Sequence, residues 1–543
     1  MSSNQLVLPA VLLGLANHAM FHHYPPKNAH YPLLALALQP PLLVFARSTL
    51  SFGSVITTGA IFLASLTASI VAYRLSPWHP LAHIPGPMLA KVSKLWGVSL
   101  LIRGNRHLVL KKLHEKHGDF VRIGPNEVSV VHAEAIRSVL GTSGFQKGPF
   151  YEPFSDPQLP TKSLLNLRSD AHANRRKIWN RGMSTDSLKD YEGILAKRIS
   201  IMLSQFDKFA NEGTKVDLSA WCSYLTFDFM GDMAFGGGFE MLRDGEDRDG
   251  IFSIIKIGIK ATAIFAQIPW IAPTVDITPG LNDVMNRLRR FGLSSAQNRV
   301  KSGPKEHKDL WYHLMDEDGH EKVKPTLPEV LVDGILAIVA GSDTSAFALS
   351  YFFWCMMTNP AIYARVKAEV DAVYPDPESI LGSEKHGELK FLTACLQESL
   401  RLFPPVPTGG AREIPAGDAK LIAGKLIPEH TQVCLPAYVI HRSPKHFFPA
   451  PDKFDPDRWL RNGSANSEIL NQGVLLTFSY GAANCAAKHL AWRELIMATS
   501  ALVRRYDMRF VDPKGKAGAK WDETLGDIYV TETGKLMVEV SAR

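Results

Sequence analysis

Three apolar stretches open the chain and distinguish it from an ordinary globular sequence. Residues 48–73 contain no charged side chain. About 20 apolar residues suffice to cross a bilayer, so this stretch is the best candidate for a membrane span. The two earlier stretches, Gln5–Phe21 and Pro32–Ala46, are interrupted by prolines, and whether they also span stays open. We therefore expect residues 1–76 to form a membrane anchor region.

Basic residues are unevenly distributed around the expected span. Lys27 and Arg47 precede it, whereas Arg74, Lys91, Lys94 and Arg103 follow it. The side of a membrane that carries the excess of lysine and arginine is the cytosolic one, so the chain beyond the span is predicted to be cytosolic. Residues 77–88 hold four prolines, which fix the backbone. They predict a stiff hinge before a globular unit over residues 89–543.

Beyond the hinge, helical periodicity dominates and the strand-like runs are short. Helices are expected over residues 89–117, 170–183, 328–358, 391–403 and 486–505, with several more between 191 and 300. A β-hairpin is expected over 120–131, with short strands near 425–428 and 433–435 and a closing pair at 508–511 and 536–540. The predicted fold class is therefore mainly α with small β-sheets (α+β).

The expected helix over 328–358 is apolar except at its middle. Gly341 is a poor helix former, and Ser342, Asp343, Thr344 and Ser345 follow it directly. Glycine beside hydroxyl groups lets a helix kink and admit water. The segment is either a functional break in a buried helix or a turn that faces the surface.

Composition excludes several classes of protein. The formal charge of +7 is mild for 543 residues, and no basic tail points to nucleic acid. The five cysteines are widely spaced and form no Cys-x-x-Cys pair. A disulfide scaffold and a structural zinc site are therefore not expected, and a reducing compartment fits.

Cys485 lies in a stretch that suits a reactive thiolate. Small and turn-forming residues precede it from Ser479 to Asn484, and a helix-compatible run follows it. The partial positive charge at a helix N-terminus lowers a cysteine pKa, and small residues let a flat cofactor approach the backbone. Cys485 is either an axial ligand of haem iron or a buried structural cysteine.

Two other pairs carry weaker signals. His172 and Arg176 are four residues apart, so they share one helical face and would clamp an anion or form a solvated basic face. Glu398 and Arg401 are three apart and fit an ordinary surface ion pair equally well. Arg458 lies in a stretch without regular period, which predicts an ordered loop.

In this order, these segments resemble a cytochrome P450, a haem-thiolate monooxygenase, over about residues 78–543. Phe478, Gly481 and Cys485 fit the family's cysteine signature, Phe-x-x-Gly-x-Arg-x-Cys-x-Gly. Residues 340–345 fit its oxygen-activating helix motif, Glu398 and Arg401 fit its Glu-x-x-Arg, and Phe454–Trp459 supplies a second arginine. The N-terminal region resembles the anchor of microsomal members, and the motif style resembles fungal members.

The resemblance implies a role for each of these residues. Cys485 would be the thiolate ligand of haem b, and Phe478 would shield its sulfur. Asp343 and Thr344 would deliver protons through water to bound dioxygen. The remaining positions would bind the haem propionates (His172, Arg176 and Arg412) or form a buried ion network (Glu398, Arg401 and Arg458).

Two departures from the family pattern weaken the haem site. Ala483 stands where a propionate-binding arginine is usual, and Ala487 stands where glycine is usual. The first removes a charge-assisted hydrogen bond worth about 1.5–3 kcal/mol. His172, Arg176 and Arg412 would compensate. These departures concern the affinity for haem more than its identity.

The implied reaction is hydroxylation of a small lipophilic molecule at the endoplasmic reticulum membrane, in fungal terpenoid or alkaloid metabolism. The chain lacks a convincing dinucleotide motif, so an NADPH-cytochrome P450 reductase is the expected electron donor. It would meet basic residues such as Lys488, Arg493 and Arg176. Two alternatives remain open: a haem-thiolate isomerase or dehydratase without a reductase, and a degenerate, non-catalytic haem-binding homologue.

Overall fold

The computed structural model describes nearly the whole chain. The described residues are 4–26, 28–47, 51–156, 158–276, 283–303, 308–376, 380–417, 419–460 and 469–543. Lys27 and the first three residues of the expected span, 48–50, lie outside them.

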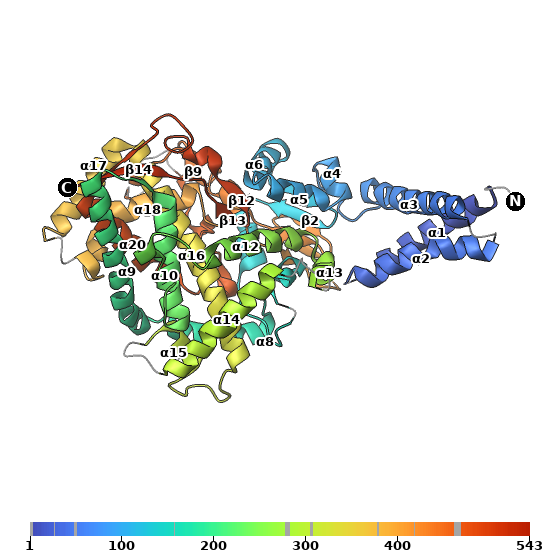
Figure 1. The fold of residues 1–543 in the computed structure, drawn as a ribbon. Helices are drawn as coiled ribbons and strands as arrows, with labels where there is room; N and C mark the ends of the chain where they lie inside the picture. The colour runs from blue at the N-terminus through green and yellow to red at the C-terminus, as the bar shows by residue number, and fades with distance from the viewer. Residues whose placement is uncertain are drawn as a thin grey trace.

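The N-terminal region forms an arm of three helices that projects from the body of the molecule (Figure 1). These are α1 (Asn4–His23), α2 (His30–Arg47) and α3 (Phe52–Leu75). Helix α3 matches the predicted span, and the two proline-interrupted stretches are helical as well. By length and composition, α1 and α3 are able to cross a membrane. Helix α16 also meets that criterion, but 61% of its apolar window is buried inside the body.

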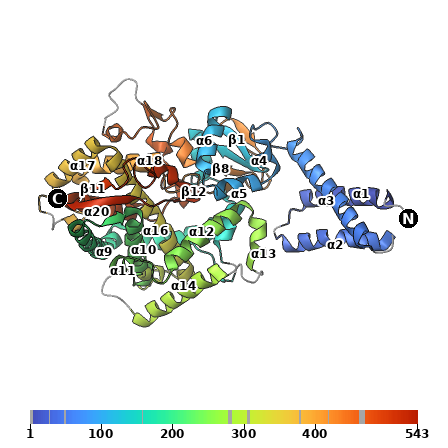
Figure 2. The ribbon, with the colours of Figure 1, turned by 45° about the horizontal axis from the view of Figure 1, so that its top comes forward.

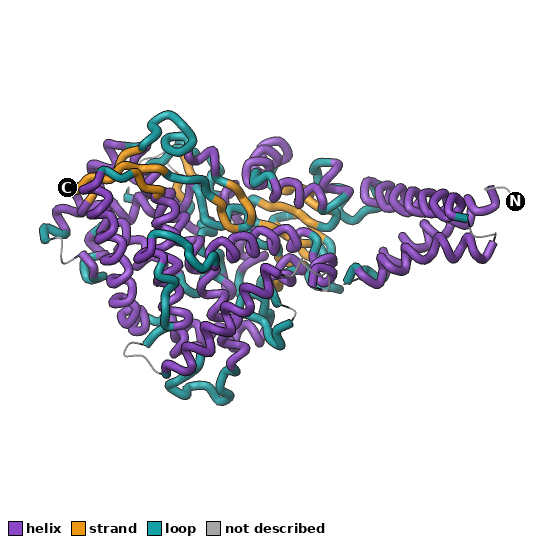
Figure 3. Tube along the Cα trace, in the orientation of Figure 1, coloured by secondary structure: helices purple, strands orange, loops and turns teal. Residues whose placement is uncertain are grey.

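The body is mainly helical, with short strands at its edges, as the sequence predicts (Figure 3). Its central element is α16 (Leu327–Thr358), which runs as one unbroken helix through the predicted polar segment. A capping box between Thr326 and Glu329 starts it. Helices α10 (Leu218–Phe235), α18 (Lys390–Leu402) and α20 (Lys488–Arg505) pack against α16 (Figure 2). Phe352 and Phe353 are fully buried in this core.

Other helices surround this centre. They are α7 (Ala133–Leu140), α8 (Ser169–Gly182), α9 (Thr185–Glu212), α11 (Met241–Asp244), α12 (Ile251–Gln267), α13 (Ala272–Asp276), α14 (Asp283–Ser302), α15 (Leu310–Leu314), α17 (Pro360–Val373) and α19 (Ala437–Ile440).

The single helix predicted over 89–117 is wrong: the segment forms α4 (Met88–Val92), α5 (Leu95–Ile102) and α6 (Arg106–His117). The break at Gly104 has a tertiary cause. Its φ of +66° requires glycine, and a Cβ there would lie 3.0 Å from the Gly526 Cα. The Asp527 N–H donates to the Gly104 carbonyl at 2.7 Å. This contact with the C-terminal region is invisible to local periodicity.

A five-stranded sheet, ordered β1-β2-β8-β5-β3, shapes one wall of the site. The predicted hairpin is present as β1 (Phe120–Gly124) and β2 (Glu127–Val130), and β8 (Gln432–Cys434) joins β2 in parallel. Strands β5 (Arg412–Glu413) and β3 (Gln146–Lys147) pair antiparallel, with Lys147 opposite Arg412. The register therefore places two cations side by side.

The remaining strands lie in smaller sheets. The predicted closing pair is present as β11 (Tyr506–Phe510) and β14 (Met537–Ala542), joined by β4 (Lys215–Asp217). Three antiparallel pairs complete the set: β6 (Lys420–Ile422) with β7 (Lys425–Ile427), β9 (Phe447–Phe448) with β10 (Ile469–Leu470), and β12 (Gly526–Ile528) with β13 (Val530–Glu532).

Candidate active site

The cysteine stretch closes one side of an internal cavity of about 360 Å³. The Cys485 N–H donates to the Phe478 carbonyl at 2.9 Å, which folds the loop before α20. Gly481 allows this fold, because its φ is +72° and a Cβ there would lie 2.0 Å from the Leu140 carbonyl oxygen. Cys485 and Phe478 line the cavity. Gly481 lies on the other side of the loop, against the Leu140 backbone.

Cys485 is the one exposed cysteine, since the other four, all within the described chain, are buried. The surrounding protein desolvates the thiolate and so raises the pKa of the Cys485 thiol. The Ala487 N–H and the charges of Arg176 and Lys488 act in the opposite direction. A metal ion deprotonates a coordinating thiol. Among the described residues no group of three or more His, Cys, Asp or Glu side chains is able to hold a metal. Cys485 as a single protein ligand therefore fits a metal ion whose remaining ligands belong to a cofactor.

Cations gather at another wall of the cavity. His172, Arg176 and Arg412 all line it, as does Lys147. The Arg412 Nε is buried and has no hydrogen-bond partner. Arg176 donates to the Asn484 carbonyl at 2.5 Å and to its side-chain oxygen at 2.7 Å, which ties α8 to the cysteine loop. This wall fits an anionic group.

His172 is neutral in this arrangement. Burial lowers its pKa to about 4, and the neighbouring charges of Lys147, Arg176 and Arg412 act in the same direction. The imidazole therefore offers one N–H donor without adding charge.

Lys147 was missed by the sequence reasoning. Its ammonium donates to the carbonyls of Leu164 at 2.9 Å and Leu167 at 3.4 Å. Burial, followed by the charge of Arg412, lowers its pKa to about 7. The available signal was a lysine in the segment 145–167, which is rich in aromatic residues, proline and glycine. A buried lysine without a carboxylate partner is costly, so a site for an anion explains its presence.

The polar segment of α16 lies partly on the cavity. Thr344 and Gly341 line it, and the Thr344 hydroxyl donates to the Ala340 carbonyl at 2.7 Å. A Cβ on Gly341 would lie 2.8 Å from the Met230 sulfur, so glycine permits the close packing of α10. The helix is not broken: Thr344 bonds within its own helix, whereas Ser342 donates to the Thr226 carbonyl of α10 at 3.4 Å and Ser345 to Glu494 of α20 at 2.6 Å.

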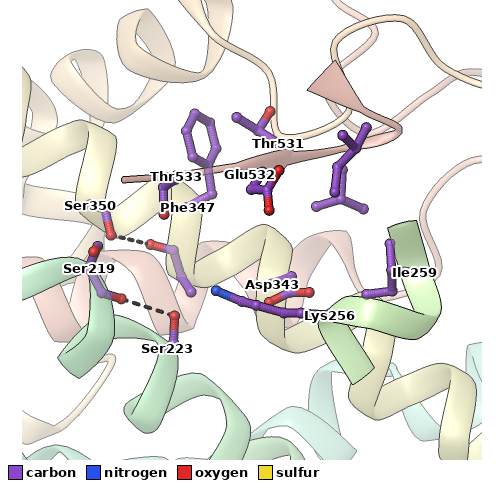
Figure 4. Close-up of a pocket in the computed structure, with 13 residues that line it drawn as sticks. Ser219, Ser223, Lys256, Ile259, Asp343, Phe347, Ser350, Thr531, Glu532 and Thr533 are labelled. Atoms are coloured by element: carbon purple, nitrogen blue, oxygen red, sulfur yellow. Dashed lines mark hydrogen bonds between the residues drawn. The ribbon is translucent and has the colours of Figure 1, made fainter. Parts of the chain in front are cut away.

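Asp343 lies on a different face of α16. It lines a small polar pocket with Lys256 of α12 and Glu532 of β13 (Figure 4). Burial raises the pKa of Asp343 to about 6, and the charge of Lys256 opposes that rise. Successive residues of a helix point about 100° apart, so Asp343 and Thr344 face the two pockets on either side of the helix.

Glu494 is a second residue that the sequence reasoning missed. It lines the cavity from α20 and accepts a hydrogen bond from the Ser345 hydroxyl at 2.6 Å. Its other carboxyl oxygen is buried without a partner. Burial raises the pKa of Glu494 to about 8. The sequence offered no signal, because a glutamate in a helix with basic neighbours reads as an ordinary surface residue.

Glu398, Arg401 and Arg458 form a buried network behind the cavity. Arg401 binds both oxygens of Glu398 at 2.8 Å, and the Arg458 Nε donates to Glu398 at 3.0 Å. The Trp459 indole and the Asp455 N–H also donate to Glu398, each at 3.0 Å. Arg458 lies in a 3₁₀ turn, Pro456–Trp459, which the network holds against α18.

Comparison with known proteins decides the family. A family model described as cytochrome P450 matches residues 87–525. The chain belongs to the cytochrome P450 family. Cytochrome P450 67 of Uromyces fabae is 31% identical over 512 residues, which cover 92% of this chain and 93% of that protein. Cytochrome P450 monooxygenase FCK2 of Fusarium pseudograminearum is 31% identical over 82% of this chain and 79% of its own length.

This P450 is a monooxygenase enzyme, as its family and its relatives indicate. Cytochrome P450 monooxygenase lcsK of Purpureocillium lilacinum is 29% identical over 98% of this chain, so the likeness includes the N-terminal arm. Both departures from the family pattern, Ala483 and Ala487, line the cavity. The arginine that is usual at position 483 would therefore have faced it.

Proposed function

We propose that Cys485 is the thiolate ligand of haem b, and that this P450 hydroxylates a small lipophilic molecule. One observation carries the proposal: a single cavity is lined by the exposed cysteine, by cations that pair with no carboxylate among the described residues, and by the threonine of α16. Haem with a thiolate ligand supplies the cleavage of the O–O bond of dioxygen.

The four polar side chains of the cationic wall would hold the two propionates. Arg176, Arg412 and Lys147 supply charge, and His172 supplies a neutral donor. Lys147 takes over the contact that Ala483 removes. Phe478 lines the same cavity as Cys485 and would shield its sulfur; its ring lies 6.2 Å from that of Trp492. The Glu398 network keeps the 3₁₀ turn that carries Arg458 in place behind the site.

Proton delivery would use both faces of α16. Among the described residues the Thr344 hydroxyl bonds only to its own helix, so rotation about χ1 would let it donate into the cavity. Asp343, with a pKa of about 6, would take up and release protons in its own pocket on the other face of α16. Glu494 holds a proton on the cavity side at neutral pH.

The anchor and the expected partners complete the proposal. Residues 1–76 would attach the enzyme to the endoplasmic reticulum membrane, residues 77–88 would be the hinge, and residues 89–543 the cytosolic catalytic domain. An NADPH-cytochrome P450 reductase would dock near Lys488, which is exposed; Arg493 is already paired with Glu192. The resemblance of its motifs to fungal members suggests a terpenoid or alkaloid intermediate as the substrate.

The test is NADPH oxidation by the purified enzyme with a supplied reductase and a panel of lipophilic substrates. Substrate-dependent NADPH consumption matched by hydroxylated product supports the proposal. Product formed without NADPH would indicate an isomerase or dehydratase. Haem binding with neither activity over the panel would favour a non-catalytic homologue.

A further inference from the structure

Helices α1 and α3 of the anchor lie side by side and run in the same direction (Figure 2). A Cβ on Gly14 would lie 2.1 Å from the Ser65 hydroxyl. His18 hydrogen-bonds Ser69 at 2.7 Å, and the His22 and Tyr73 rings are 4.7 Å apart. The partners advance together along both helices. The pairing is therefore parallel and in register over the C-terminal half of α1.

Helix α2 joins them along the chain and runs back in the opposite direction (Figure 1). It begins at the end nearest the body, where the Ala29 N–H donates to the Trp270 carbonyl at 2.9 Å. It ends at the far end of the arm, next to the start of α3 (Figure 1). Midway, the Asn17 amide donates to the Gln39 oxygen at 2.6 Å, and the Gln39 amide donates back at 3.2 Å. The side-chain amides of Asn17 in α1 and Gln39 in α2 thus hydrogen-bond each other.

The outward faces of the three helices suit lipid. Exposed apolar side chains occur on all of them: Leu8, Leu12 and Leu15 on α1, Leu33, Leu34, Leu38, Leu42 and Phe45 on α2, and Phe52, Ile56 and Leu63 on α3. Charged residues within the three helices are confined to their last turns, at Arg47 and Arg74. Helices of 20, 18 and 24 residues reach about 30, 27 and 36 Å at 1.5 Å per residue, close to the hydrocarbon thickness of about 30 Å.

We infer that the anchor is a three-span bundle, with the N-terminus on the opposite side of the membrane from the catalytic domain. Two parallel helices cross a bilayer in the same direction, so the segment that joins them must cross back. That segment is α2, although composition alone does not qualify it as a span. Its glutamine is tolerated because Asn17 is its partner, and amide pairs of this kind hold membrane helices together. The inference rests on the membrane anchoring proposed above.

The bundle also orients the catalytic domain. On this topology residues 24–26 and Ala29, between α1 and α2, lie on the catalytic side of the membrane. The Ala29 N–H contacts the carbonyl of Trp270, which lies between α12 and α13 and is partly exposed. Together with the covalent link through the hinge, this gives the domain two attachment points. A single span would give it one.

Cysteine labelling in sealed microsomes separates the topologies. Tyr24→Cys places an exposed probe directly after α1, and Phe52→Cys places one at the start of α3, at the end of the arm far from the body. The unmodified chain, in which Cys485 is exposed and the other four cysteines are buried, gives the background that is subtracted. A membrane-impermeant maleimide is expected to label Tyr24→Cys in intact vesicles, and Phe52→Cys only after permeabilisation.

Every other labelling pattern contradicts the inference. If both sites need permeabilisation, only α3 spans. If both label in intact vesicles, the arm lies on the cytosolic surface. If neither labels in detergent, a site-specific protease sequence inserted between Pro25 and Pro26 decides, and cleavage in intact vesicles is the expected result. Extraction by alkaline carbonate would disprove the anchoring itself, whereas haem spectra, which report the proposed function, are independent of all these outcomes.

Discussion

Two buried glutamates in this P450 are expected to respond in opposite ways to the same substitution. Glu398 faces two guanidinium groups at 2.8–3.0 Å, whereas in the described part of the chain Glu494 has one hydroxyl partner and no cation. We consider Glu398→Gln and Glu494→Gln, each of which removes the negative charge and keeps the shape. The first leaves Arg401 and Arg458 buried without a carboxylate. The second imitates the protonated form already present.

The magnitudes follow from burial and charge. Breaking a buried ion pair from one side costs about 3–5 kcal/mol of folding free energy, and this applies to Glu398→Gln. Burial raises the pKa of Glu494 from 4.5 to about 8. Because the folded chain holds this proton more tightly than the unfolded chain, the free energy of unfolding falls as pH rises from 4.5 to about 8. The slope reaches about 1.4 kcal/mol per pH unit, and Glu494→Gln abolishes it.

The assay is urea unfolding of the purified holoproteins in detergent over pH 5 to 8, followed by loss of the haem spectrum. Glu398→Gln should be destabilised throughout. Glu494→Gln should match the parent near pH 5 and become relatively more stable toward pH 8. If Glu398→Gln does not accumulate, Trp459→Phe removes one neutral donor to Glu398 and should cost about 1 kcal/mol. Equal losses in the two glutamine variants would refute the reasoning.

Three further predictions concern the cavity. Lys147→Met should speed haem transfer to an acceptor globin about ten- to a hundred-fold, because a charge-assisted bond is worth about 1.5–3 kcal/mol; the exposed Lys177→Met is the control, and equal rates would exclude the propionate role. Thr344→Ala should divert NADPH electrons from product to hydrogen peroxide, with Thr344→Ser retaining coupling; unchanged coupling in both would exclude the hydroxyl from proton delivery. Gly481→Ala should reduce haem loading of the folded protein, because its Cβ meets the Leu140 carbonyl; normal loading would contradict that geometry.

The local elements of the fold were predictable because their signals are local. The long helix α16, the hairpin of β1 and β2, and the α18 helix bearing Glu398 all follow from periodicity and turn residues. The family resemblance then pointed to Cys485, Thr344 and the cationic residues, and the structure brings these together around one cavity. Their roles remain predictions until the variants are measured.

What the sequence did not indicate depends on distant contacts. Lys147 reaches the cavity because β3 pairs with β5, and Glu494 is buried because α20 packs on α16. Asp343 faces a second pocket because α12 and β13 cover that side of the helix. The parallel pairing of α1 and α3 likewise depends on side chains about 51 residues apart. Periodicity within one segment carries none of this information.

The most direct measurement is the absorption spectrum of the reduced, carbon-monoxide-bound holoprotein, compared with Cys485→Ser. The parent should show the Soret band of a thiolate-ligated haem, and the variant should lose that band while its fold is retained. A purified, haem-loaded parent without the thiolate band, or a variant that keeps it, would contradict the central claim that Cys485 is the ligand.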